Sequence, residues 1–172
     1  MEKRLSRCFR RQVLKGGKRY VGYTGKHKIN GLKRNIVVDA KGNPLAMTCG
    51  QANHHDQKFA LKTVDRITVR GKIRRPKRLG ADKGYDDDKF RKELKQRRIQ
   101  PCLIRRQNNR KNITQSELRE KKYSQQRWKV ERSFNWINNN RRIDRFMEKK
   151  AVNYQGFCYL MFIKYYLKKL SI

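Results

Sequence analysis

The sequence predicts a mixed α/β fold, and three observations carry this prediction. The chain has 172 residues, a length that suits one domain with a buried core. Segments rich in β-branched residues alternate with segments whose apolar residues recur every three or four positions. Eight Tyr, seven Phe and two Trp are more aromatic residues than a disordered chain carries. The predicted order is strand, strand, helix, strand, helix, strand, helix, helix, in a layered arrangement.

The N-terminal half opens on a basic segment without a clear period. We therefore expect residues 1–15 to be irregular and residues 16–172 to form the domain. Residues 35–39 and 45–49 are predicted strands, and the Gly, Asn and Pro between them predict a turn that makes an antiparallel hairpin. A helix is predicted over 54–67, because Ala60, Val64 and Ile67 fall on one helical face.

The C-terminal half contains two more strands and three helices by the same criteria. Residues 79–82 form a short apolar strand that ends in an acid, and residues 99–104 form another, with Pro101 indicating an edge position or a bulge. Between them, three Asp residues precede an apolar stripe that ends in two Arg residues, as the helix dipole favours. Helical periods continue over 124–140 and over about 152–170.

Charge indicates the class of partner. Lys and Arg number 47 and Asp and Glu number 14, so the formal net charge is +33. Self-repulsion of this size favours a polyanion as partner, most simply nucleic acid. The longest apolar run, at 157–163, is far short of a membrane span, and no apolar segment follows the basic start as in a secretory signal. Four scattered Cys residues give no zinc motif and no disulfide framework, so a reducing cytoplasm is expected.

Two of the few acidic residues lie at positions where α/β folds often place functional side chains. Asp82 ends a strand, at the edge where open α/β sheets hold functional groups, and Glu131 lies beside the apolar face of a helix. Carboxylates from separate elements can hold divalent ions for phosphodiester exchange. The simpler interpretations stay open: Asp82 as a turn residue, and Glu131 as the i, i+4 partner of Arg127.

We expect His54 and His55 to mark a helix start rather than a metal site. Packing is the expected role of both Trp128 and Trp136.

Two blocks of this sequence resemble a known family. Residues 81–86, Ala-Asp-Lys-Gly-Tyr-Asp, resemble the block that carries the second acid of bacterial and archaeal insertion-sequence transposases of the DDE type. Residues 127–136, which begin Arg-Trp-Lys-Val-Glu-Arg, resemble the block with their final glutamate. The resemblance runs in the family's order from about residue 16 to residue 170. It implies an RNase H-like fold, a mixed sheet flanked by helices.

The resemblance also implies an activity and a site. The activity would be Mg²⁺-dependent (or Mn²⁺-dependent) cleavage of double-stranded DNA at transposon ends and its transfer to target DNA. Asp82 and Glu131 would be catalytic residues and metal ligands. A homodimer is one assembly that the resemblance implies, in the cytoplasm of a bacterium or archaeon. The residues expected to contact DNA are Lys83, Arg127, Arg132, Arg141 and Arg142.

The sequence departs from the family in its first block. The family has its first aspartate on the first strand, but residues 7–14 contain no acid, and none occurs between Glu2 and Asp39. We therefore expect the first strand to be degenerate or missing, and Asp39 could replace the acid only in a rearranged site. Ser124 and Asn138 stand where the family often has Tyr and Lys, and the usual N-terminal helix-turn-helix region is missing. The chain is accordingly expected to be a truncated catalytic domain with weak or no activity alone.

Two rival functions explain the same charge. The first is a non-enzymatic DNA- or RNA-binding protein, whose binding would fall steeply with salt and would not depend on Mg²⁺. The second is an RNase H-like nuclease that cuts without joining. Only the two acidic blocks and their order favour the transposase.

Overall fold

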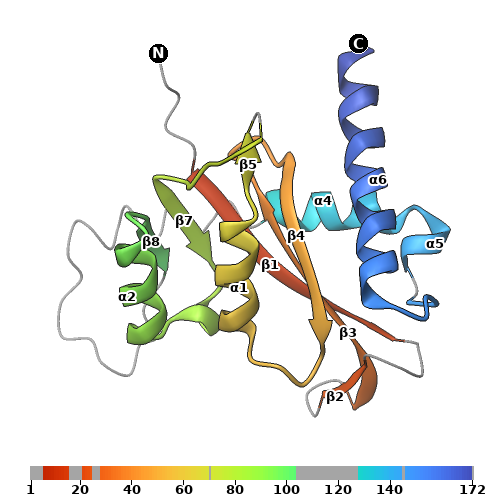
Figure 1. Ribbon diagram of the computed structural model, residues 1–172, viewed down its shortest axis with the longest axis horizontal. Helices are drawn as coiled ribbons and strands as arrows, with labels where there is room; N and C mark the ends of the chain where they lie inside the picture. The colour runs from red at the N-terminus through yellow and green to blue at the C-terminus, as the bar shows by residue number, and fades with distance from the viewer. Residues whose placement is uncertain are drawn as a thin grey trace.

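The chain folds into a mixed β-sheet with helices on both faces (Figure 1). A computed structural model describes residues 6–15, 21–24, 28–69, 71–103, 128–144 and 146–171, with the backbone alone at residues 6–15. The strands are β1 (Ser6–Lys15), β2 (Gly22–Thr24), β3 (Ile29–Val38), β4 (Pro44–Gln51), β5 (Thr68–Val69), β6 (Lys72–Ile73), β7 (Arg78–Ala81) and β8 (Gln100–Leu103). The α-helices are α1 (Asp56–Asp65), α2 (Asp88–Gln96), α4 (Trp128–Asn138), α5 (Arg141–Asp144) and α6 (Ala151–Leu170).

Strand β1 lies in the middle of the main sheet. It pairs antiparallel with β3, from Cys8 opposite Val38 to Lys15 opposite Gly31, and parallel with β7, where Cys8 lies opposite Gly80. The expectation of a degenerate or missing first strand, with residues 1–15 irregular, is therefore wrong for residues 6–15. The physical reason is that this strand is specified by its neighbours. Backbone hydrogen bonds on both edges hold it, although its basic side chains show no apolar alternation.

The predicted hairpin is confirmed, and it is longer than the apolar residues indicated. β3 and β4 pair antiparallel from Leu32 opposite Gln51 to Val38 opposite Pro44. β3 starts earlier than predicted because its first residues pair with β2 on one edge and with β1 on the other. β8 pairs with β7 alone in the sheet order of the described strands, so the predicted edge position is also confirmed.

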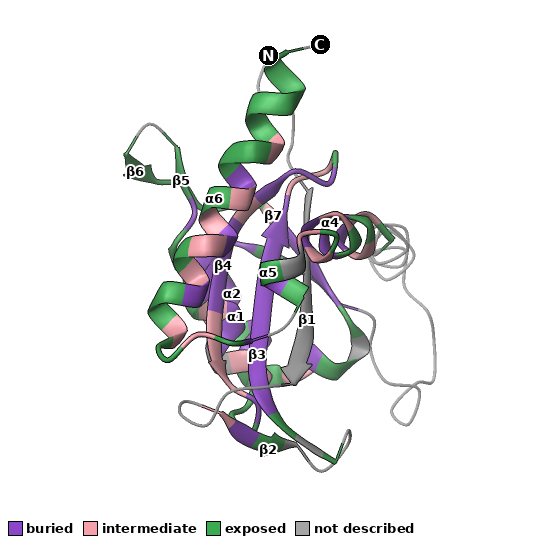
Figure 2. Ribbon diagram, turned by 90° about the vertical axis from the view of Figure 1, so that its right-hand side faces the viewer, coloured by how far each residue is buried: buried purple, intermediate pink, exposed green. Residues whose placement is uncertain are grey.

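Strand alternation divides the core into two halves (Figure 2). Ile36 and Met47 pack with α4 and α6 on one face, whereas their neighbours Val37 and Ala46 pack with α1, α2, β7 and β8 on the other. The helix faces predicted from the sequence are buried as expected, on α1 (Ala60, Val64), α2 (Phe90, Leu94) and α4 (Val130, Phe134, Ile137). None of the helices in the described ranges is long and apolar enough to cross a bilayer.

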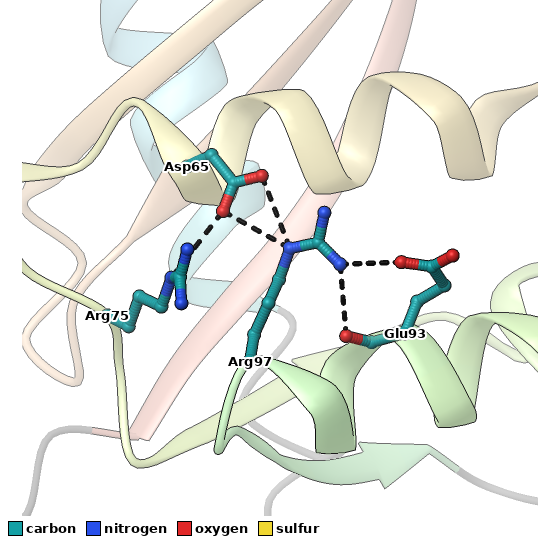
Figure 3. A network of polar contacts seen from close by, with 4 residues as sticks. All are labelled: Asp65, Arg75, Glu93 and Arg97. Carbon is teal, nitrogen blue, oxygen red and sulfur yellow. Dashed lines mark hydrogen bonds and ion pairs between the residues drawn. The ribbon is translucent and has the colours of Figure 1, made fainter.

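Ion pairs join α1 and α2 on one face of the sheet. Arg97, at the C-terminus of α2, donates through Nε to both Asp65 oxygens at 3.2 Å and through Nη1 to Glu93 Oε2 at 2.6 Å (Figure 3). The hydrogen bond with Glu93 raises the pKa of Arg97, so this guanidinium stays charged. Arg75 also approaches Asp65, at 3.7 Å. The network ties the end of α1 to the end of α2.

On the other face, α6 is held along β4 by tyrosines. Tyr159 donates to the carbonyl of Met47 at 3.0 Å, and Tyr166 donates to that of Pro44 at 2.7 Å. The inner side of α6 belongs to the core, since Tyr154 and Cys158 are fully buried. Its C-terminal half extends beyond the sheet (Figure 1) and exposes Leu160, Ile163, Leu167 and Leu170.

The packing of α1 against β4 predicts a sharp difference between two glycines. A Cβ atom at Gly50 would collide with the ring of Phe59, whereas one at Gly84 would meet nothing within 4 Å. We expect Gly50→Ala to lower the free energy of unfolding by about 1–3 kcal/mol, as overpacked cores do. The matched variant Gly84→Ala should stay within about 0.5 kcal/mol of the parent. Thermal unfolding followed by circular dichroism measures both, and equal midpoints would contradict the packing.

Candidate active site

Asp82 lies at the carboxyl end of parallel strands. It directly follows β7, which runs parallel to both β1 and β8. Its backbone carbonyl accepts the N–H of Tyr85 at 2.9 Å, which starts the short 3₁₀ turn η1 (Lys83–Tyr85). Tyr85 is buried against Phe90 and anchors this turn, while Asp82 itself is exposed. The fold therefore presents Asp82 at the edge where open sheets hold functional groups.

Glu131 lies in the first turn of α4, and the hairpin fixes that turn. Lys129 Nζ donates to the carbonyl of Ala40 at 2.6 Å, and Ser133 Oγ donates to that of Gly42 at 2.6 Å. Val130, on the inner face of α4, is fully buried. Glu131 is half-buried, on the flank of the helix away from the hairpin contacts.

The two carboxylates belong to the same face of the sheet. Leu79 and Ala81 pack in the core half with α1 and α2. Because strand residues alternate between faces, Gly80 and, by extension, Asp82 belong to the opposite face, which α4 covers. This alternation assigns the acid after β7 and the acid on α4 to one side of the sheet.

A third ligand for a metal centre is missing from the described residues. No group of three His, Cys, Asp or Glu side chains gathers in them, and the β1 sequence contains no acid. Divalent ions such as Mg²⁺ need several oxygen ligands, so two carboxylates fall short of a complete set. His54 and His55 do not add to it: His54 is exposed and stacks near Phe59, and His55 precedes α1, as predicted.

Asp39 does not replace the missing acid, because its carboxylate builds the hairpin turn. Oδ1 accepts the backbone N–H groups of Lys41 at 2.8 Å and Asn43 at 2.9 Å, and Oδ2 accepts the Asn43 side chain at 2.7 Å. Asn43 in turn accepts from Lys169 and Tyr165 on α6. Asp39 is thus part of the joint between the hairpin and the last helix.

The residues predicted to contact DNA divide into three groups. Arg132 is exposed, stacks over Trp128 at 5.1 Å and donates to the carbonyl of Lys41 at 2.9 Å. Arg142 is exposed and pairs with Glu148 at 2.9 Å. Arg127 lies outside the described residues, and of Lys83 and Arg141 only the backbone is described, at the starts of η1 and α5.

The two tryptophans differ from each other. Trp136 packs edge-to-face on Tyr165 at 4.9 Å, as predicted. Trp128 is 53% exposed, so of the two expected kinds of packing, in the core or on a flank, the core is excluded. The cations of Lys129 and Arg132 lie over its ring instead.

Comparison with known proteins decides the family. A family model described as "Transposase DDE domain" matches residues 4–167. The chain belongs to the DDE transposase family. The match begins before β1, so it includes the strand that lacks an acid. DDE transposases generally use divalent metal ions, and their substrate is DNA.

A curated relative supports the same assignment. The chain is 35% identical over 126 residues to the "Putative transposase for insertion sequence element IS402" of Burkholderia cepacia. The match covers 70% of this chain and 56% of that protein. The chain therefore spans little more than half the length of this relative.

A buried arginine that was not among the predicted site residues lies beneath the transposase helix α4. Arg34 is fully buried on β3, donates to Tyr154 Oη at 3.1 Å and to Asn138 Oδ1 at 2.5 Å, and lies 5.1 Å from the Phe134 ring centre. Asn138, at the C-terminal end of α4, thus accepts from a guanidinium that β3 supplies. The signal was available, because Arg34 interrupts the apolar alternation of Leu32, Ile36 and Val38.

Burial also sets the protonation of the groups around Arg34. It raises the pKa of both Cys49 and Cys158 above the ordinary thiol value, while the Arg34 charge acts in the opposite direction. It likewise raises the pKa of Tyr154, whose hydroxyl donates to the carbonyl of Ile143 at 2.6 Å. These groups stay neutral near pH 7, and none of them offers a nucleophile.

The role of Asp39 gives a test that separates structure from metal binding. Asp39→Ala removes three hydrogen bonds of the turn, and we expect it to lower the free energy of unfolding by about 1–3 kcal/mol. The control Asp144→Ala, which removes the same charge from an exposed position on α5, should be nearly neutral. Urea unfolding measures both. Full stability of the Asp39 variant, with loss of Mg²⁺ binding, would make Asp39 a ligand instead.

Proposed function

We propose that this chain is the catalytic domain of an insertion-sequence transposase, acting on transposon ends and target DNA with Mg²⁺ or Mn²⁺. Asp82 and Glu131 are proposed as the catalytic and metal-binding carboxylates. The observation that carries the proposal is the position of one acid directly after a parallel strand and of another on α4, which strand alternation assigns to one face of the sheet. Both acids fall within residues 4–167, the range of the family match.

The basic residues near these acids are proposed to hold DNA. Arg132 and Arg142 are exposed cations on α4 and α5, and Lys83, Arg127 and Arg141 complete the proposed set. Cations on a surface attract phosphate and release counterions when DNA binds. A homodimer that pairs two transposon ends is part of the same proposal.

We further propose that the activity of this chain alone is weak or absent, for a reason visible in the strand register. Cys8 pairs with Gly80, so two more residues along both strands bring Arg10 level with Asp82. On its other edge Arg10 pairs with Ile36, in the core half beneath α4. Neighbouring strands lie about 4.8 Å apart, so an acid at position 10 would neighbour Asp82. The sequence has Arg at this position, so the proposed site lacks the acid that a third ligand would require.

Restoring the acid tests the proposal by a gain of activity. We expect Arg10→Asp to raise metal-dependent nicking of a supercoiled plasmid about tenfold or more over the parent, because a third carboxylate adds an oxygen ligand. The control is Arg11→Asp, which makes the same charge change one residue along. Strand alternation assigns position 11 to the opposite face, so no gain is expected there.

The outcomes of this experiment are distinct. Adding Glu131→Ala to the Arg10→Asp variant should remove the gained activity. Robust nicking by the parent, abolished by Glu131→Ala, would contradict the proposed weakness. Equal gains from the two aspartate variants, or none from either, would contradict the proposed metal site.

A non-enzymatic nucleic-acid-binding protein is the second candidate. The observation that favours it is the net charge of +33 together with the missing third ligand. If the chain is a transposase domain, we expect its affinity for DNA to change when Mg²⁺ is added and when Asp82 is replaced by Ala (Asp82→Ala). Fluorescence anisotropy with a labelled duplex measures this, with Asp144→Ala as a control of equal charge. Binding that is unaffected by Mg²⁺ and by either variant would favour the second candidate.

Transfer of a labelled 3′ end into a second duplex separates a transposase from a simple nuclease.

A further inference from the structure

A small two-stranded ribbon stands apart from the main sheet. β5 and β6 pair only with each other in the described strands, with Thr68 opposite Ile73 and Val69 opposite Lys72. A two-residue connection at 70–71 joins them, and Gly71 takes the φ of +74° that such tight turns require. At the base, Arg74 N–H donates to the Ile67 carbonyl at 2.8 Å. Figure 2 shows this ribbon projecting from the body.

The ribbon and its flanks carry charge of one sign. Seven of the thirteen residues from 66 to 78 are Lys or Arg, and no acid occurs between Asp65 and Asp82. Residues 71–75 are all exposed. Near the base of the ribbon, Arg75 approaches Asp65, and Arg78 donates to Gln100 at 3.0 Å. The contact between Arg75 and Asp65 lies at the foot of the ribbon (Figure 3), and the exposed ribbon projects from the body (Figure 2).

The outer part of the ribbon also exposes two apolar side chains. Val69 is 46% exposed and Ile73 is 62% exposed, on neighbouring strands. A solvated basic connector would explain the charge, but it would need neither a paired hairpin nor β-branched residues at its exposed end. A two-stranded hairpin is marginally stable by itself, so a ligand that covers it would stabilise it.

We propose that the β5–β6 ribbon enters a groove of double-stranded DNA and forms a DNA contact separate from the acidic site. The major groove is about 12 Å wide and admits a two-stranded ribbon. Lys72 on β6 and the cations that flank the ribbon in sequence can then reach the phosphates on either side. Val69 lies opposite Lys72 and Ile73 lies opposite Thr68, so the two apolar side chains belong to opposite faces of the ribbon. The face turned toward the floor of the groove brings one of them to apolar base edges such as the thymine methyl group. The ribbon leads into the start of β7 and Asp82 follows its end, so the two sites lie at opposite ends of that strand.

The proposal rests on the proposed function only in requiring that the chain bind DNA. It does not depend on metal binding or catalysis. The test uses the full chain and a fluorescent 30-base-pair duplex, and measures Kd by anisotropy over a range of salt concentrations. One variant, Lys72→Gln with Arg74→Gln, removes two ribbon cations. A second variant, Gly71→Val, keeps every charge but disfavours the turn, because β-branched residues rarely adopt positive φ.

The control removes two cations elsewhere. Lys164→Gln with Lys168→Gln makes the same charge change at exposed positions of α6. We expect the ribbon double variant to weaken binding by about tenfold and to reduce the slope of log Kd against log salt by about 1.8, the value for two lost phosphate contacts. Gly71→Val should weaken binding at unchanged net charge, and the control should change it less than either. Thermal unfolding confirms that each variant is folded.

The outcomes separate this proposal from the proposed function. Binding by the parent that both ribbon variants weaken more than the control supports the ribbon. Equal losses in the double variant and the control, or parental affinity in Gly71→Val, overturn it and leave the transposase proposal intact. A parent chain without affinity for duplex DNA overturns both.

Discussion

Hydrogen bonds along both edges of β1 hold the rest of the structure together. One edge completes the antiparallel hairpin of β3 and β4, and the other begins the parallel part formed by β7 and β8. Residues 31–38 of β3 are all buried, so without β1 their backbone groups would lose their partners in a place that water cannot reach. Asp82 follows the parallel part, whereas α4, which carries Glu131, is anchored to the hairpin. The two acids therefore share a face only because β1 joins these two halves.

A second constraint is the arginine beneath the helices. Burying a charge is costly unless it is hydrogen-bonded, and Arg34 is surrounded by the Tyr154 hydroxyl, the Asn138 amide and the Phe134 ring. These partners come from α6 and α4, so a single guanidinium on β3 fixes the positions of both helices. The same charge opposes the effect of burial on the neighbouring thiols. Through Asn138, Arg34 also holds the C-terminal end of the helix that begins near Glu131.

The scarce acids of this chain serve mainly to hold the fold. Asp56 pairs with Lys33 at 2.6 Å, Asp86 with Arg91 at 2.7 Å and Glu148 with Arg142 at 2.9 Å, while Asp65 and Glu93 share Arg97. With 47 cations against 14 acids, most positive charge cannot be neutralised within the chain. Most of the positive charge of the chain therefore faces other cations or solvent, and a polyanion would offset it. The fold places these cations on particular elements, and that arrangement is what would distinguish a DNA-binding surface from a solvated one.

Local patterns in the sequence determined the hairpin, the apolar faces of α1, α2 and α4, and the positions of Asp82 after a strand and Glu131 on a helix. These features follow from turn residues and helical periods within about fifteen residues, so they are readable without the fold. Tertiary structure alone decided that Ser6–Lys15 is a central strand, because its hydrogen-bonding partners lie more than fifteen and sixty residues away. It also decided that the carboxylate of Asp39 belongs to a turn and that residues 68–73 project as a ribbon. The physical reason is the same in each case: strand pairing and burial are fixed by residues distant in the chain, and they leave little trace in the local sequence.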